Sequence, residues 1–203
     1  MDKVKIALKK IFRSYIWLFV LLFALDVLSK WLVVGALKSE GNSIEVIKDF
    51  FYITLSFNTG SAFSLGAGNM AMRIVFIVIS WLMSIGISFY YIRHYKKEDL
   101  WMNAVYAMLL AGALGNLIDR TFYWEETVGF TGVIDFLQFY IFGRNANPFA
   151  TFNIADASLV VGVAIAIIVV IVRLIKEKMK ESAEEQARKD KIVEEKEDED
   201  NHN

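Results

Sequence analysis

Four long apolar segments dominate this sequence of 203 residues and restrict what the chain can fold into. They run approximately over residues 15–37, 71–92, 101–122 and 152–175. Each is long enough to cross a hydrocarbon layer of about 30 Å, which takes roughly 20 helical residues. Backbone N–H and C=O groups find no water in lipid, so such segments must be helical. The sequence therefore predicts an α-helical integral membrane protein with four transmembrane helices.

The composition supports this fold class and excludes several kinds of chemistry. Hydrophobic residues make up 56% of the chain, above the roughly 45–50% of soluble proteins. The chain has no cysteine, which excludes disulfides, thiolate metal sites and a thiol nucleophile. Its two histidines, His94 and His202, lie near no reactive cluster, so neither a Ser-His-Asp triad nor a histidine-bound zinc is indicated. We expect no metal, no cofactor and no nucleic-acid partner.

The distribution of Lys and Arg predicts the orientation of the spans. Basic residues precede the first span, fill the connection between the second and third, and follow the fourth. These connections should be cytoplasmic, so both termini are expected there. The first apolar segment is too long for a cleaved signal peptide and contains charges. Residues 1–13 should form a short basic amphipathic helix on the anionic inner leaflet.

Two segments are then expected to face outward. In the first, residues 43–65, apolar and polar residues alternate from 53 to 58, which is typical of a strand. Residues 58–60 have turn composition. We therefore predict a small extracytoplasmic β-sheet, and an aromatic outward-facing loop over the second segment, residues 123–150.

The last part of the chain is chemically different. Residues 177–203 contain more acids than bases, few apolar residues and no sustained period. This pattern predicts a short helix that frays into a disordered, acidic cytoplasmic tail. The expected division is thus a four-span membrane domain, residues 1–176, and a tail, residues 177–203.

Charged residues inside the spans require an explanation. Asp26 and Lys30 lie four residues apart, on one face of the first helix. They can form a self-neutralising pair that permits insertion, or they can support a site by holding loops and helices.

A second polar group lies near the end of the third span. Asn116, Asp119 and Arg120 share one helical face, and Gly112 and Gly115 leave a smooth patch that another helix can approach. We expect Arg120 to pair with Asp119, which assigns Asp119 to the scaffold rather than to proton transfer.

Two further acids are candidates for catalysis. Asp135 and Asp156 have apolar neighbours and should meet near the outer membrane boundary. Two poorly solvated carboxylates cannot both ionise comfortably, so one keeps a proton and the pair can act as acid and base. Asp156 alone could equally cap its helix beside Asn153. The presence of both acids favours catalysis.

Asn58 is a further polar residue on the outward side. By itself it is an ordinary turn residue. The small residues after it, Gly60, Ser61 and Ala62, would leave room for an extended peptide.

Five fragments, in this order on four spans, resemble bacterial lipoprotein signal peptidase, also called signal peptidase II: DVLSK, FNTGSAF, GALGNLIDR, VIDF and FNIADASLVVG. The resemblance covers residues 15–175. It implies an aspartic endopeptidase of the bacterial cytoplasmic (inner) membrane, with its site facing outward. Such an enzyme removes the signal peptide of prolipoproteins just before a cysteine that carries a diacylglyceryl group. The implied partners are these prolipoproteins and membrane lipids, and a monomer is expected.

The resemblance also assigns residues. Asp135 and Asp156 match the family's catalytic pair. Residues that match substrate-binding or supporting positions are Asp26, Lys30, Asn58, Gly60, Asn116, Asp119, Arg120 and Asn153. Departures are Val27, Ser29 and Ser61, where the family usually has Gln, Thr and Ala. The segment between Asp119 and Asp135 is longer than in the family, which leaves the position of the outer loop open.

Without the family resemblance, the residues also permit other functions. A proton-coupled carrier would also place acids among spans, although carriers usually have repeats and broken helices around a midplane site. A peptidase using Ser61 and Lys30 is conceivable, because a buried lysine can act as a base. It would leave Asp135 and Asp156 unexplained. A membrane adaptor could use the acidic tail.

Overall fold

The computed structural model describes residues 2–60, 69–123 and 128–201. Within these ranges four helices are long and apolar enough to cross a membrane: α2 (Ile16–Leu37), α3 (Met70–His94), α4 (Leu100–Phe122) and the first part of α6, Ile154–Lys189. The first three agree with the expected spans to within two residues, whereas the fourth begins two residues later than expected and its helix continues well past residue 175. The predicted fold class, four spans with a small sheet, is confirmed.

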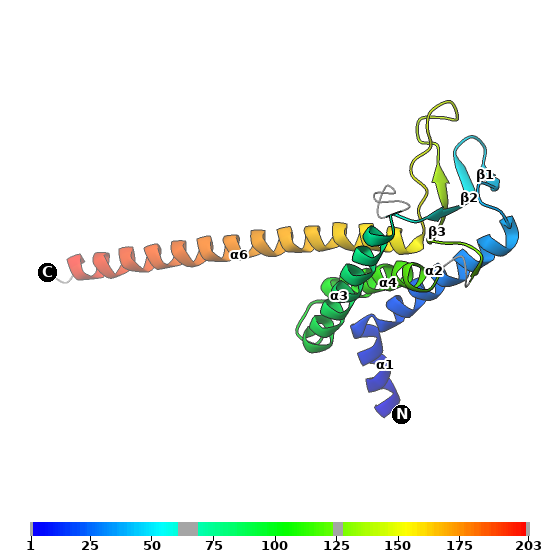
Figure 1. Cartoon of the computed structure of the whole chain (residues 1–203). Helices are drawn as coiled ribbons and strands as arrows, with labels where there is room; N and C mark the ends of the chain where they lie inside the picture. Colours follow the sequence, from blue (N-terminus) through cyan, green and yellow to red (C-terminus); the bar gives the residue numbers. More distant parts are fainter. Residues whose placement is uncertain (1, 61–68, 124–127, 202–203) are drawn as a thin grey trace. The chain divides into compact units, whose positions relative to one another are not determined.

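A separate helix precedes the first span. Helix α1 (Asp2–Ser14) ends where Tyr15 adopts a left-handed backbone conformation, with φ 53°. The chain therefore changes direction before α2 begins, as Figure 1 shows. The expected N-terminal helix is present, and its position on a membrane surface stays a prediction.

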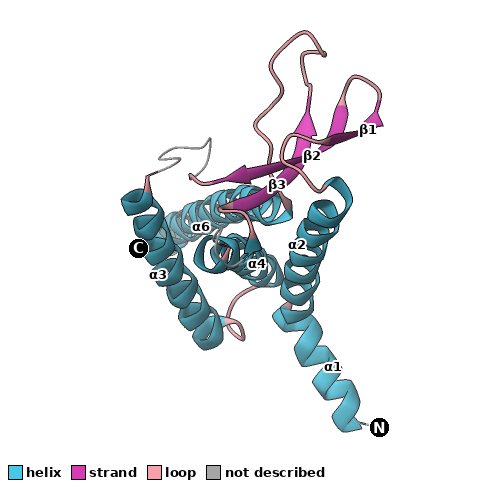
Figure 2. Ribbon diagram, turned by 45° about the vertical axis from the view of Figure 1, so that its right-hand side comes forward, coloured by secondary structure: helices cyan, strands magenta, loops and turns pink. Residues whose placement is uncertain are grey.

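Helix α4 lies between α2, α3 and the start of α6 (Figure 2). Its small residues permit this close packing. A Cβ atom built on Gly112 would lie 2.5 Å from the carbonyl oxygen of Ala155, and one built on Gly115 would lie 2.5 Å from Oδ2 of Asp26. The smooth patch expected on the third span thus receives α6 at one glycine and α2 at the other.

A three-stranded antiparallel sheet covers one end of the helices, here called the sheet end. It consists of β1 (Ser43–Ile47), β2 (Phe51–Asn58) and β3 (Val133–Phe139), in that order. The strand expected near residue 53 is β2. Strand β3 was not predicted, because its first four residues are all buried and such a strand shows no alternation of polar and apolar residues.

The core joins the sheet to the ends of α2 and α4. Its fully buried members include Leu55 of β2 and Ile134 of β3, each with 0% exposure. Val33 and Leu37 from the last turns of α2 pack against them. This contact fixes β3 at the helix ends and so determines the position of Asp135.

Helix α6 (Ile154–Asn201) continues through the charged part of the chain. Residues 177–201 are helical, which is longer than the short helix followed by a disordered tail that the sequence predicted. Exposed pairs four residues apart favour helix here, with Lys180 3.6 Å from Glu184 and Lys189 2.7 Å from Glu185, although each pair contributes only about 0.3–0.5 kcal/mol. The division into a membrane domain and a tail at residue 176 stays a prediction.

Candidate active site

A cavity of about 630 Å³ opens at the sheet end between β3, α4 and the start of α6. Its lining includes both acids that the sequence singled out, and most of the rest of the lining is apolar. The polar lining residues are Asn58, Asn116, Arg120, Asp135, Thr151 and Asp156, and the apolar ones include Phe149, Phe152, Leu159, Val160 and Val161.

Asp135 is held in the cavity by the sheet. It is paired with Ser56 of β2 in the ladder and is only 3% exposed. Asn58 Nδ2 donates to its Oδ2 at 3.1 Å, and Asn153 Nδ2 donates to its Oδ1 at 2.7 Å. Both carboxyl oxygens therefore have fixed directions.

Asp156 lies in the first turn of α6 and forms a reciprocal cap with Asn153. The backbone N–H of Asp156 donates to Asn153 Oδ1 at 2.9 Å, and the backbone N–H of Asn153 donates to Asp156 Oδ2 at 3.1 Å. This is the geometry of a capping box. The other oxygen, Oδ1, accepts from Asn116 Nδ2 at 2.7 Å. Asp156 thus caps the helix and also faces the cavity, so the two interpretations of this residue are compatible.

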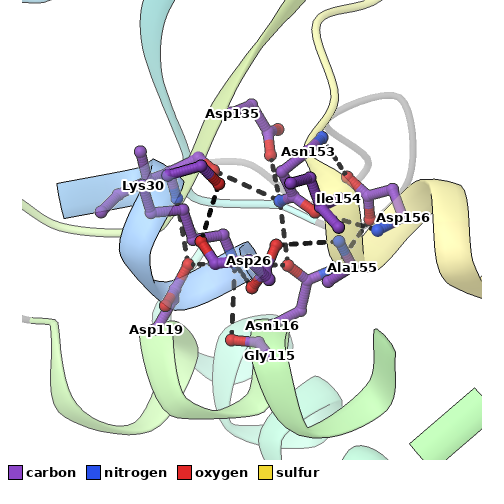
Figure 3. Close-up of polar contacts among 12 residues, drawn as sticks. Asp26, Lys30, Gly115, Asn116, Asp119, Asp135, Asn153, Ile154, Ala155 and Asp156 are labelled. Atoms are coloured by element: carbon purple, nitrogen blue, oxygen red, sulfur yellow. Dashed lines mark hydrogen bonds and ion pairs between the residues drawn. The ribbon is translucent and has the colours of Figure 1, made fainter. Parts of the chain in front are cut away.

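A short backbone bridge brings the two acids together. Phe152 pairs with Leu137 on the edge of β3, and α6 begins two residues later. The intervening Asn153 is fully buried and bonded to both acidic side chains (Figure 3). Asp135 and Asp156, separated in sequence, therefore share one neighbour and one cavity.

The environment of Asp135 favours its protonated form. Burial raises the pKa of this carboxyl, and the negative charge of Asp156 raises it further, to about 7. The hydrogen bonds from Asn58 and Asn153 act in the opposite direction. Asp135 can accordingly hold a proton near neutral pH.

Three buried charged side chains, Asp26, Lys30 and Asp119, form an ion network beside the site. Lys30 Nζ is 2.7 Å from Asp26 Oδ2 and 2.8 Å from Asp119 Oδ2, and all three side chains are 1% exposed. The expected pairing of Asp26 with Lys30 is present. The expected pairing of Asp119 with Arg120 is wrong. Consecutive side chains point about 100° apart on a helix. Asp119 therefore contacts Lys30 of α2, while Arg120 lines the cavity.

The network holds the backbone beside each acid. Asp119 Oδ2 accepts from the N–H of Ile134, the residue before Asp135. Asp26 Oδ1 accepts at 2.8 Å from the N–H of Ala155, the residue before Asp156. Buried charges are favourable only when paired and hydrogen-bonded in this way.

Lys30 also joins the network to the residues around Asp156. Its Nζ donates to Asn116 Oδ1 at 3.1 Å.

In the described ranges, no group of three His, Asp or Glu residues is arranged to hold a metal ion.

One residue near the site was missed from the sequence. Arg73, in the first turn of α3, is 4% exposed and donates to the carbonyl oxygens of Arg120, at 2.9 Å, and Tyr123, at 2.7 Å. These bonds satisfy carbonyls at the end of α4 that have no helical partner. The sequence did contain a signal for this residue, because a lone Arg at the start of an apolar span is unusual.

The remaining candidates lie beside β2. Gly60 donates its N–H to Asn58 Oδ1 at 3.0 Å, which forms the expected turn. Ser61 falls within residues 61–68, outside the described residues. Its proposed partner Lys30 contacts two carboxylates.

The chain is similar to known proteins over most of its length. The family model described as signal peptidase (SPase) II matches residues 18–172. The lipoprotein signal peptidase of Bacillus pumilus (strain SAFR-032) is 41% identical over 154 residues, covering 76% of this chain and 89% of that protein. That of Bacillus subtilis (strain 168) is 39% identical, covering 76% and 90%.

The chain also resembles solved structures in sequence and fold. Two structures described as bacterial membrane enzymes are 31% identical to the chain, with TM-scores of 0.62 and 0.59. The first match covers 78% of this chain and 87% of the solved chain. The second covers 77% of this chain and 92% of the solved chain. Because the family model and the relatives extend over most of its length, the chain belongs to the signal peptidase II family.

Proposed function

We propose that this protein is an aspartic endopeptidase that removes signal peptides from lipid-modified prolipoproteins, cutting just before the diacylglyceryl-cysteine. Its membership of the signal peptidase II family supports the substrate class. The observation that carries the aspartic chemistry is the shared cavity of Asp135 and Asp156, both bonded to Asn153.

The two acids have different roles in this mechanism. Asp156, ionised, takes a proton from a water held between the carboxyl groups, and the water oxygen attacks the scissile carbonyl carbon. Asp135, which keeps its proton because its pKa is raised, donates a hydrogen bond to the carbonyl oxygen. The tetrahedral intermediate collapses as Asp156 returns its proton to the leaving cysteine amine. The step requires neither metal nor cofactor.

The other polar residues position this pair and the peptide. Asn58, Asn116 and Asn153 orient the carboxyl groups through the hydrogen bonds described above. Arg120 lines the same cavity and supplies a positive charge beside both acids. Residues that support the site from outside the cavity are Asp26, Lys30, Gly60 and Asp119.

The apolar residues that line the cavity suit the rest of the substrate. They come mainly from α6 and from the segment before it, among them Phe149, Phe152 and Val160. A signal-peptide helix and lipid chains entering sideways from the bilayer would contact these residues instead of water.

The location follows from the spans and their flanking charges. We place the protein in the bacterial cytoplasmic (inner) membrane as a monomer, with both termini in the cytoplasm and the sheet end facing outward. The proton-coupled carrier and the Ser61/Lys30 peptidase are not favoured, because the family match and the named relatives are peptidases of the lipoprotein type.

The decisive experiment replaces each acid singly. Asp135→Asn and Asp156→Asn should each lower cleavage of a lipidated prolipoprotein by about 10²–10⁴-fold, the range for loss of an acid or base. Asp49→Asn, in the exposed β1–β2 turn, is the matched control and should cleave normally. Membrane insertion is checked for each variant by extraction with detergent.

The result that would contradict this proposal is normal cleavage by either acid variant. Loss of cleavage in Ser61→Ala at the same time would indicate serine chemistry instead. Absence of cleavage in the unaltered chain would indicate a carrier or an adaptor.

A further inference from the structure

A second cavity lies at the opposite end of the helices, here called the α1 end. It has a volume of about 590 Å³ and lies where α1, α2 and α4 meet. Its lining is apolar and aromatic except for one guanidinium, that of Arg13. The lining residues are Phe12, Arg13, Tyr15, Trp17 and Leu100.

Hydrogen bonds hold the chain in place around this cavity. The hydroxyl of Tyr91 donates to the carbonyl oxygen of Ser14, and Asn103 Nδ2 donates to that of Arg13 at 3.2 Å. Asn103 is fully buried. The junction of α1 and α2 is thereby tied to α3 and α4, so the cavity is a built feature of the fold.

The rings of the cavity indicate its level in the membrane. Trp17 lies 6.1 Å from Phe12 and 5.8 Å from Tyr15, measured between ring centroids. Phe12 is 62% exposed and Leu100 is 51% exposed. Trp and Tyr gather at membrane–water interfaces, where one part of the ring system is apolar and the other is wet.

Arg13 supplies the polar side of the site. A guanidinium has five N–H donors, and among the described residues only the carbonyl oxygen of Lys96 accepts from it, at 3.3 Å. Other donors of Arg13 therefore remain for an anion. Guanidinium groups bind phosphate with particular geometric fit.

The surroundings of Arg13 are positively charged. Lys10, Lys96 and Lys97 are exposed at this end. Of the two acids that follow, Glu98 accepts from the hydroxyl of Tyr90 at 3.3 Å and Asp99 accepts from the N–H of Met102 at 2.8 Å. The basic residues thus exceed the acids, and an anion is the complementary ligand.

We propose that this cavity binds one anionic phospholipid, with the phosphate on Arg13 and an acyl chain along Phe12 and Trp17. A free phosphate would leave the apolar walls unused, and a neutral lipid would leave the guanidinium without a counter-ion. The site shares no lining residue with the cavity of Asp135 and Asp156. It is a second site, and its binding can be measured without any cleavage reaction.

The test compares two lipids of identical acyl chains, phosphatidylglycerol and phosphatidylcholine, bound to the full-length protein in detergent and counted by native mass spectrometry. The unaltered protein should retain one phosphatidylglycerol in preference to phosphatidylcholine. Arg13→Gln should weaken phosphatidylglycerol retention about fivefold, the effect of one basic residue near an anionic surface, and leave phosphatidylcholine unchanged.

Lys97→Gln is the matched control. It removes one positive charge from the same end but lies outside the cavity, so it should retain phosphatidylglycerol. Equal retention of the two lipids by the unaltered protein would overturn the proposal. An equal loss in Lys97→Gln and Arg13→Gln would also overturn it, because that result indicates diffuse charge instead of a site.

Three further measurements keep the test independent of folding and of catalysis. Phe12→Ser changes an exposed side chain and should lower phosphatidylglycerol retention, and unchanged retention in this variant would contradict the acyl-chain contact. Inorganic phosphate at millimolar concentration should not displace the lipid. Asp135→Asn should bind phosphatidylglycerol like the unaltered protein, so loss of cleavage and loss of lipid binding are separable.

Discussion

Asn153 connects the two acids through different atoms. Its side-chain Nδ2 donates to Asp135, while its backbone N–H donates to Asp156. Because Asn153 is also the N-terminal cap of α6, the start of this helix and the spacing of the carboxyl groups depend on the same residue. A single buried amide thus links helix capping to the proposed chemistry.

At the same scale, the proton on Asp135 predicts a pH dependence of cleavage. The pKa of Asp135 is raised to about 7, so the rate of cleavage should fall as pH rises through that value. Initial rates with a lipidated prolipoprotein between pH 5 and 9 check this. A rate that stays constant up to about pH 9 would contradict the assignment of Asp135 as the proton donor.

The same proton contributes to stability. The native pKa lies above the value of about 4 in an unfolded chain, so the stabilisation is fully present below about pH 4 and is lost as pH rises through about 7. The melting temperature in detergent should therefore fall over this window. Asp135→Asn should show a shallower fall, and an identical fall in both proteins would contradict the prediction.

At the scale of the elements, α4 is the helix against which the others are placed. Its glycines let α2 and α6 approach closely enough for Asp26 to reach the N–H of Ala155. Arg73 holds the end of α4 from the side of α3. The site is therefore assembled from helix ends whose distances depend on small residues.

Adding a methyl group to these glycines should disturb the assembly. In Gly115→Ala the new Cβ would lie 2.5 Å from Asp26 Oδ2 and 3.0 Å from Ala155 Cβ. Overpacking of this kind destabilises by about 1–3 kcal/mol, so the melting temperature should fall and cleavage with it. Gly86→Ala in α3, where the new Cβ would meet no described atom within 4 Å apart from its own stretch of helix, should leave both unchanged or raise the melting temperature. Equal effects of the two substitutions would contradict the close-approach argument.

At the scale of the whole molecule, the spans separate two sites. The cavity of Asp135 and Asp156 lies at the sheet end, and the cavity around Arg13 lies at the α1 end. The proposed orientation places the first on the outer side, where exported prolipoproteins are, and the second in the cytoplasmic leaflet, which is rich in anionic lipid.

The absence of native cysteine makes this orientation directly testable. Lys48→Cys, in the β1–β2 turn, and Lys97→Cys, between α3 and α4, each introduce the single thiol of the chain at an exposed position. A membrane-impermeant maleimide applied to intact cells without an outer membrane should label residue 48 and leave residue 97 unlabelled until the cells are lysed. The reverse pattern would show that the orientation is wrong.

The sequence by itself determined the four spans, one strand and the two candidate acids. Span length and apolar content are local properties, so they can be read from a window of about 20 residues. Asp135 and Asp156 were visible because a carboxylate among apolar neighbours is costly unless it has a partner or a function.

Only the tertiary structure decided how these residues meet. It paired Asp119 with Lys30 instead of Arg120, made the segment around Asp135 a strand, and placed Asn153 between the two acids. The ion pair and the edge of the sheet join residues far apart in the chain, and their geometry depends on which faces of α2, α4 and α6 pack together. The sequence predicted a close approach at Gly112 and Gly115, but only the tertiary structure decided that α6 packs at Gly112 and Asp26 of α2 at Gly115.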